Sequence, residues 1–317
     1  MAFSPNRFKQ QFPPVLVAPG AGIFQQSAPV NGGNGVAKGA GNSSEGYGLI
    51  APALAVMAAG LVAPLALMLV TSLKTQSADG WTLAHYGAVF GRSSYRILFA
   101  RSLLISGAVT LVTVALAYPV AYYVAFHTRR KFIWLVALTI PFWTSYLLRV
   151  FAWKIILGFN GLINSGLMRL GVIHEPLSFL LYNPFAVVVT LAHAWAAFAI
   201  LPIYVSLEKI DRSLLEAASD LGDGRLRRFL RITLPLSMPG LVGAALLIFV
   251  PTTGDYVTPQ LVGGTQGSMI ANLIEVQFIS AGNWPLGAAL SLASMTMVAV
   301  IAGLFVSAAR AATKAAR

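Results

Sequence analysis

Long uncharged segments alternate with short charged ones along this chain, and the alternation predicts its helices. Six segments contain no Asp, Glu, Lys or Arg, and each approaches or exceeds the roughly 20 residues with which a helix crosses a bilayer. They run from Gly46 to Leu73, Ser102 to Thr128, Phe132 to Leu148, Pro176 to Leu207, Ile232 to Gly254 and Val276 to Ala309. The pattern predicts an all-α integral membrane protein with six transmembrane helices and both termini on one side.

The same pattern gives the expected bounds of each part of the chain. The helices are expected at about residues 48–72, 102–127, 132–153, 184–206, 239–257 and 286–309. The third must extend past Arg149, because its uncharged segment is the shortest. Residues 207–238, here named the charged loop, separate the fourth and fifth helices within a transmembrane domain of residues 48–310. Residues 1–47, rich in Gly, Asn, Ser and Pro, are expected to be a disordered tail, and 311–317 a second tail.

The composition agrees with a bilayer as the solvent. Of 317 residues, 57% are hydrophobic and only 10% are charged, against about 25% charged in soluble domains. Most of the 22 Lys and Arg residues gather in the two tails, the turn around Arg130 and the charged loop. Six helices bring these four places to one side, which the positive-inside rule makes cytoplasmic. The net charge of +12 therefore reflects a multi-pass topology with cytoplasmic termini, and no nucleic-acid partner is expected.

The charged loop contains its own short helices. Asp211 is a suitable N-cap, because its carboxylate can accept from the free N–H groups of a first helical turn. Gly222 can adopt the left-handed conformation that ends such a helix, and a second helix is expected to start at Asp223 or Gly224. Pro235 is expected to end the motif, since proline disfavours helix at the residue before it. Two short helices around a glycine would form a knob for a groove in a partner, or an amphipathic loop lying on lipid headgroups.

The residue spacing in this loop carries a family resemblance. Glu216, Ala217 and Ala218 are followed by three residues, then by Gly222, and nine residues later by Ile232, Leu234 and Pro235. This pattern resembles the coupling loop of permease subunits of ATP-binding-cassette importers, which have the type I importer fold and lie in the bacterial inner membrane. The resemblance implies that these seven residues couple the chain to a cytoplasmic ATPase, with Glu216 and Gly222 central to docking.

The resemblance also implies partners. They are an ATPase dimer that binds ATP and Mg²⁺, a second permease subunit that is a paralogue rather than a second copy, an extracytoplasmic substrate-binding protein, and membrane lipid. The chain itself has no G-x-x-x-x-G-K-[ST] nucleotide motif and no cysteine, and its histidines lie at no metal-ligand spacing. We therefore expect a translocation subunit without catalytic residues, metal or bound cofactor.

Two further sequence segments indicate which solute is transported. The segments Pro141 to Arg149 and Pro251 to Gly264 resemble the permeases of spermidine and putrescine importers, which implies a polyamine as the solute. Relatives that carry other solutes share these motifs. An amino-acid derivative, a phosphonate or ferric ion stays an alternative, as does an assembly protein that docks an ATPase without moving a solute.

Asp255 is the acidic residue with the most unusual setting, because it ends an uncharged segment between two prolines and beside a glycine. A carboxylate near the hydrocarbon core costs about 2.5 to 3.5 kcal/mol and usually faces a pathway or a partner. It could supply the counter-charge for an amine, with Trp143, Tyr146 and Tyr256 offering faces for cation–π contacts of about 0.5 to 2 kcal/mol. Alternatively, Asp255 forms an ion pair with Arg149 or lies exposed at the interface.

Overall fold

The computed structural model describes residues 43–76 and 80–315. The chain divides into two units, residues 1–56 and 57–317. In the first unit, residues 43–56 form the start of helix α1 (Ser43–Ser72). The expected disordered tail over 1–47 is therefore wrong for residues 43–47, which are helical. Residues 1–42 lie outside the described part of the chain.

The second unit is built from helices. They are α2 (Ala84–Gly91), α3 (Ser93–Phe126), α4 (Lys131–Thr139), α5 (Tyr146–Leu157), α6 (Leu162–Arg169), α7 (Pro184–Glu208), α8 (Arg212–Asp220), α9 (Arg225–Arg228), α10 (Leu234–Thr253), α11 (Gly264–Gly267), α12 (Ile270–Glu275) and α13 (Trp284–Ala315). Short 3₁₀ turns η1 (Ile140–Trp143) and η2 (Ser178–Leu180) and π-helical turns η3 (Phe229–Thr233), η4 (Pro259–Gly263) and η5 (Val276–Ser280) connect them. Within the described ranges, the extended pairing is confined to one bridge between Lys74 and Trp81.

Six helical segments of the described residues are long and apolar enough to span a membrane. They are Ala51–Ser72, Ser93–Phe126, Tyr146–Arg169, Pro184–Glu208, Arg225–Thr253 and Trp284–Ala311. The prediction of an all-α membrane protein with six spanning helices is confirmed in class and number. The bounds and continuity of several helices differ from expectation.

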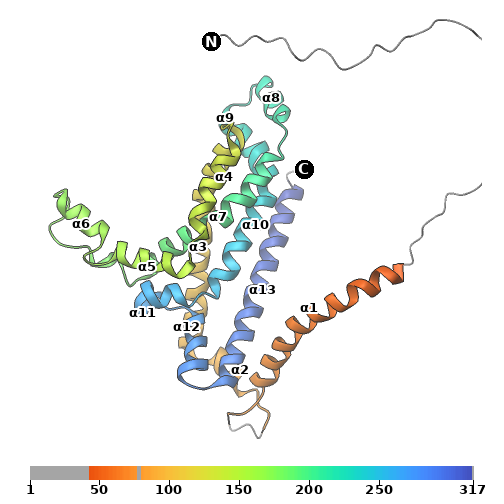
Figure 1. The fold of residues 1–317 in the computed structure, drawn as a ribbon, viewed down its shortest axis with the longest axis vertical. Helices are drawn as coiled ribbons and strands as arrows, with labels where there is room; N and C mark the ends of the chain where they lie inside the picture. The colour runs from red at the N-terminus through yellow and green to blue at the C-terminus, as the bar shows by residue number, and fades with distance from the viewer. Residues whose placement is uncertain (1–42, 77–79, 316–317) are drawn as a thin grey trace, which may run out of the picture. The chain divides into compact units, whose positions relative to one another are not determined.

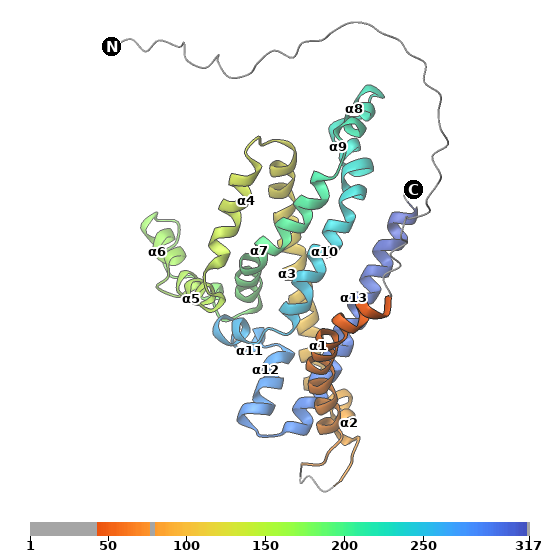
Figure 2. The same cartoon turned by 45° about the vertical axis from the view of Figure 1, so that its right-hand side comes forward.

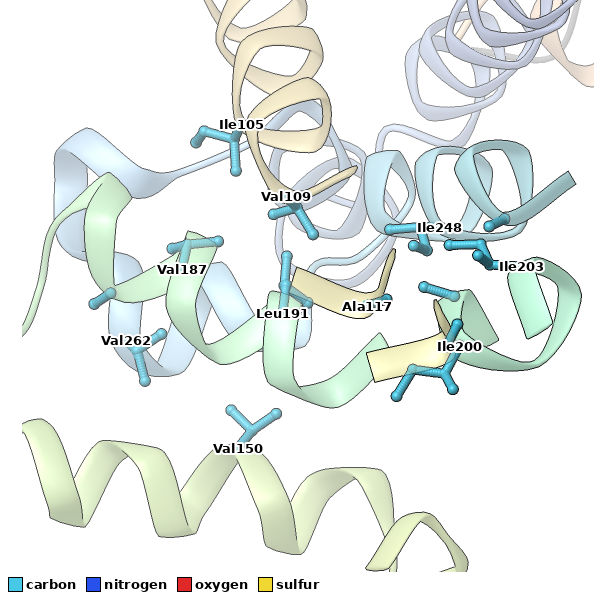
Figure 3. Close-up of a cluster of buried hydrophobic side chains, with 14 of the residues drawn as sticks. Ile105, Val109, Ala117, Val150, Val187, Leu191, Ile200, Ile203, Ile248 and Val262 are labelled. Carbon is cyan, nitrogen blue, oxygen red and sulfur yellow. The ribbon is translucent and has the colours of Figure 1, made fainter. Parts of the chain in front are cut away.

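The core of the second unit lies between α3, α7 and α10, which run side by side (Figures 1 and 2). Side chains from all three interlock at the centre of this contact, and α5 covers one flank with the fully buried Val150 (Figure 3). The central residues are Ile105, Val109, Ala117, Val187, Leu191, Ile200, Ile203 and Ile248. The start of α7 is fixed by Asn183, whose side chain accepts from the backbone N–H of Ala186 at 3.0 Å, and Pro184 follows in the first turn, where no donor is needed.

Helices α7 and α10 approach each other closely at Gly240. A Cβ atom there would lie 2.4 Å from Ser206 Cβ and 2.6 Å from the carbonyl oxygen of Pro202. Neither atom can retreat without moving helix α7. Glycine is therefore required at this position, and it holds the two backbones together near the charged loop.

The expected third helix, 132–153, is not continuous. Helix α4 is followed by the turn η1, which contains Pro141. The next two residues, Thr144 and Ser145, are extended, and α5 then runs in a different direction from α4 (Figures 1 and 2). Pro141 removes a backbone donor, and the Thr144 hydroxyl donates to the Pro141 carbonyl at 2.8 Å, which stabilises the break. The apolar segment Tyr146–Arg169 is itself two helices, α5 and α6, interrupted at Gly158–Gly161.

Other helix ends also differ. Helix α3 begins at Ser93 rather than near 102, because Arg96 and Arg101 lie in its first turns, where a long side chain can reach polar surroundings. Arg101 Nη1 donates to the Thr265 carbonyl at 3.0 Å. Helix α10 occupies Leu234–Thr253 rather than 239–257, with Pro235 at its second residue. The π-helical turn η3 directly precedes it, and such turns interrupt the regular hydrogen-bond pattern of an α-helix. Helix α13 continues through the expected tail to Ala315.

We predict that Gly240→Ala lowers the free energy of unfolding by about 1–3 kcal/mol, because the added methyl group overpacks the contact with Pro202 and Ser206. The measurement is the thermal unfolding midpoint of the detergent-solubilised protein. Gly243→Ala is the matched control, since a Cβ atom at Gly243 meets no described atom within 4 Å. Equal midpoints for the two variants would contradict this account of the contact.

Candidate functional site

Helix α8 is formed by local interactions at both of its ends. The Asp211 side chain accepts from the backbone N–H of Ser213 at 3.0 Å and caps the first turn. This donation from the Ser213 backbone, together with the Ser213 side chain, holds the pKa of Asp211 below its ordinary value. At the other end, Gly222 has φ +84°, its N–H donates to Ser219 O at 2.9 Å, and the Asp223 N–H donates to Ala218 O at 3.0 Å. These two bonds form a Schellman motif, so the expectations that Asp211 caps this helix and that Gly222 ends it are confirmed.

The second helix of the charged loop continues into the transmembrane bundle. Helix α9 begins at Arg225, with Gly224 as its N-cap, and passes through η3 into α10 as one helical segment, Arg225–Thr253. The Arg228 Nη1 atom donates to the Leu215 carbonyl at 3.3 Å and ties α9 to α8. Since the segment is 29 residues long, it spans about 43 Å at 1.5 Å per residue. The second helix of the knob is therefore continuous with the bundle.

The knob formed by α8 and α9 exposes both apolar and charged side chains. Leu221 is 88% exposed, and Leu214, Leu226 and Leu230 are also exposed. Glu216 and Ala217 lie on the exposed surface, Ala218 is buried, and Ile232, Leu234 and Pro235 are partly buried where the loop joins α10. An exposed apolar patch with charged neighbours is typical of a protein-binding surface.

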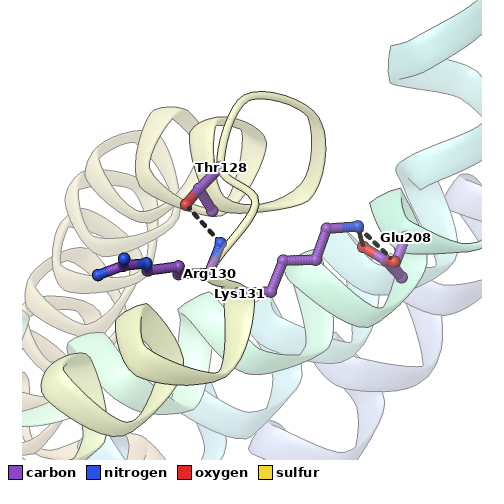
Figure 4. A network of polar contacts seen from close by, with 4 residues as sticks. All are labelled: Thr128, Arg130, Lys131 and Glu208. Atoms are coloured by element: carbon purple, nitrogen blue, oxygen red, sulfur yellow. Dashed lines mark hydrogen bonds and ion pairs between the residues drawn. The ribbon is translucent and has the colours of Figure 1, made fainter. Parts of the chain in front are cut away.

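An ion pair fixes the bundle end from which the knob projects. Lys131 Nζ donates to both carboxylate oxygens of Glu208, at 2.7 and 2.9 Å, and so joins the α3–α4 turn to the last residue of α7 (Figure 4). In the same turn, the Arg130 backbone N–H donates to the Thr128 hydroxyl at 3.2 Å. The basic turn and the charged loop are thus neighbours, and the C-terminal part of α13 lies at the same end (Figure 1).

A cavity of about 280 Å³ lies among α5, α7, the end of α10 and the segment that follows it. Its walls are formed by Tyr146, Arg149, Ala194, Trp195, Phe198, Pro251 and Asp255. The Tyr146 hydroxyl donates to Asp255 Oδ2 at 2.6 Å, and the Val257 N–H donates to Oδ1 at 3.0 Å. Arg149 Nη1 donates to the Ala194 carbonyl at 2.9 Å. Asp255 and Arg149 therefore share the cavity, but they are not an ion pair within the described residues.

The cavity brings together three of the five residues predicted for a solute pathway. Tyr146, Arg149 and Asp255 line it, whereas Trp143 is 89% exposed on η1 and Tyr256 is 43% exposed. The sequence analysis missed Trp195 and Phe198, which lie three residues apart and so share a face of α7. The spacing of these two residues is visible in the sequence, but an aromatic pair in a long apolar segment more often packs in the core than lines a site. In the described part of the chain, no three His, Asp or Glu side chains gather as a metal site.

Six potential membrane-spanning helices, a projecting helical knob and a charged cavity define the class as a polytopic subunit of a membrane transport system. Over residues 80–313 the chain matches the family described as binding-protein-dependent transport system inner membrane component. The match covers well over half of the sequence, and the chain belongs to this family.

Individual proteins are also similar to this chain. The chain is 38% identical over 220 residues to the spermidine/putrescine transport system permease protein PotB of Escherichia coli K12, covering 69% of this chain and 78% of the relative. Two crystal structures of a bacterial alginate ABC transporter share the fold. One, described as involved in alginate import, has a TM-score of 0.69 at 15% identity and covers 84% of this chain and 96% of the other. The second, in complex with an alginate pentasaccharide-bound periplasmic protein, has a TM-score of 0.68 at 16% identity and covers 86% of this chain and 96% of the other.

We predict that Asp211→Ala increases amide hydrogen exchange in α8 several-fold, because the first turn loses its cap. Asp211→Asn is the matched control, since its amide oxygen can accept the same bond. A carboxyl group whose pKa is lowered on folding contributes stability above its unfolded pKa of about 3.9 and loses it as pH falls through the lower folded value. Protection of wild-type α8 should therefore be constant between about pH 5 and pH 8, and a decline within that range would contradict this role.

Proposed function

We propose that this chain is the membrane-spanning permease subunit of an ATP-driven importer of small amines, with polyamines as the first candidates. The observation that carries this proposal is the 38% identity over most of the length of a spermidine/putrescine permease. The carboxylate of Asp255 in the cavity supports an amine as the solute, because an ammonium group can bind a carboxylate whose charge no ion pair neutralises.

The energy would come from a separate ATPase dimer, which holds ATP and Mg²⁺. The knob of α8 and α9 supports this assignment, since its exposed leucines surround a surface that also presents Glu216. This knob would dock in a groove of the ATPase on the cytoplasmic side, where the basic residues of the charged loop and of the α3–α4 turn also lie. Both termini would then be cytoplasmic, in agreement with the positive-inside rule.

Two further partners complete the proposed importer. A second permease subunit, a paralogue of this chain, would cover the lipid-facing sides of the bundle that the chain leaves open. A substrate-binding protein would deliver the solute at the outer end, as the periplasmic protein bound to the alginate transporter suggests. Neither partner needs a cofactor from this chain.

The helices supply a path between the two sites. Closure of the ATPase dimer would move α8, and the Arg228 bond to Leu215 would carry this motion to α9. Because α9, η3 and α10 form one helical segment, the motion reaches Pro251 and the cavity beside Asp255. Alternating access of the cavity to the two sides would follow from this movement.

We predict that Gly222→Ala weakens association with the ATPase about fivefold or more. A non-glycine residue in the left-handed conformation costs roughly 1–2 kcal/mol, so the end of α8 would be displaced. Gly224→Ser is the matched control, because Gly224 has φ −66°, a Cβ atom there meets nothing within 4 Å, and serine is a good N-cap. The measurement is co-purification of the ATPase with the permease at graded concentrations. Equal retention by both variants would remove Gly222 from the docking surface.

We predict that Asp255→Asn lowers ATP-driven uptake of putrescine at least tenfold in vesicles that contain the complete importer, because an uncharged amide binds ammonium more weakly than a carboxylate does. Assembly with the ATPase should be unchanged. Glu175→Gln, which removes an exposed carboxylate from the segment between α6 and α7, is the control and should transport normally. Uptake at the wild-type rate by Asp255→Asn would exclude Asp255 from solute binding.

A further inference from the structure

The cavity wall contains a positive charge, on Arg149, that has no ion-pair partner in residues 43–76 and 80–315. Of the guanidinium donors of Arg149, one bond is formed, from Nη1 to the Ala194 carbonyl at 2.9 Å. The Nε atom is buried and has no hydrogen-bond partner among the described residues. The Phe142 ring lies 5.1 Å from Cζ. These contacts hold the guanidinium in place without neutralising its charge.

The negative charge in the same cavity is held separately. Asp255 receives one hydrogen bond on each oxygen, from the Tyr146 hydroxyl and from the Val257 N–H. These bonds fix the carboxylate on the side of the cavity next to the end of α10, while the Ala194 carbonyl holds Arg149 against α7. The two charges therefore line one cavity as separate groups.

Separated charges of opposite sign restrict which solute the cavity can bind. Ionisable groups in a membrane-embedded site are costly unless they are paired, so a ligand that neutralises both groups is favoured over one that meets only Asp255. A solute with ammonium groups at both ends would bring one of them towards Arg149. A planar guanidinium binds carboxylates and phosphonates with paired, charge-assisted hydrogen bonds.

We propose that the cavity binds a small zwitterionic amine, with its ammonium group at Asp255 and a carboxylate or phosphonate at Arg149. This inference rests on the proposed import function, and among small amines it places zwitterions ahead of the polyamines. The volume of about 280 Å³ is at the lower limit of the roughly 300–1,000 Å³ found for ligand pockets, which suits a short chain. Arg149 is then a specificity-determining residue.

The test compares putrescine with 4-aminobutyrate, which has the same four-carbon chain but carries a carboxylate in place of one ammonium group. Equilibrium binding of each probe to the detergent-solubilised importer, without the delivering binding protein, measures the cavity directly. We expect 4-aminobutyrate to bind at least tenfold more tightly than putrescine. Arg149→Gln should lower the affinity for 4-aminobutyrate at least tenfold and leave the affinity for putrescine unchanged or higher. Asp255→Asn should lower the affinity for both probes.

Lys154→Gln is the control, because it removes a positive charge from the same helix outside the cavity. Arg149→Lys keeps the charge and should retain part of the 4-aminobutyrate affinity. If 4-aminobutyrate binds no more tightly than putrescine, or if Arg149→Gln weakens both probes equally, the inference is wrong. The comparison of 4-aminobutyrate with putrescine uses the wild-type importer, so it tests the inference even where a variant fails to fold. ATP-driven uptake of putrescine without binding of 4-aminobutyrate would overturn this inference alone, whereas the absence of ATP-driven uptake of either probe would overturn the proposed function.

Discussion

The contact between α7 and α10 at Gly240 is the constraint on which both sites depend. Helix α7 leads into the charged loop and α10 leaves it, while the middle of α7 and the far end of α10 wall the cavity. Because a Cβ atom at Gly240 would lie 2.6 Å from the Pro202 carbonyl oxygen, the backbones touch without an intervening side chain. Closely packed interiors have low compressibility and transmit strain, so in the proposed cycle a force applied to the knob would reach the cavity through the paired helices.

The cavity illustrates how a membrane protein holds charge away from water. Each charged group is fixed by neutral hydrogen-bonding partners: Asp255 by Tyr146 and Val257, and Arg149 by the Ala194 carbonyl. Such contacts position a charge but leave it able to interact with a ligand. Since the partners belong to different helices, the distance between the two charges depends on how α5, α7 and α10 are arranged. A change in helix arrangement would therefore alter affinity for the solute, which a transport cycle requires.

The predictable parts of this protein are those set by local rules. The Asp211 cap and the left-handed Gly222 follow from a few adjacent residues, and the structure forms both. The class and number of helices follow from the uncharged segments. Pro235 was expected to end the motif, but the helix continues through it, with the π-helical turn η3 directly before the start of α10 at Leu234. Gly240 has the same sequence signal as Gly243, and only its contacts with α7 distinguish the two.

The largest departure from expectation is the break in the third helix, and this break helps to build the cavity. A hydrophobic pattern alone favours a continuous helix through Pro141. In the structure the chain stops at η1 and restarts at Tyr146, the first residue of α5, whose hydroxyl reaches Asp255 across 109 positions of sequence. Arg149 follows one turn later on α5. The alginate transporter shares the fold at 15% identity, so the fold cannot by itself determine the solute. In the proposed importer, selectivity would come from side chains at such breaks, where local sequence preference gives way to tertiary contacts.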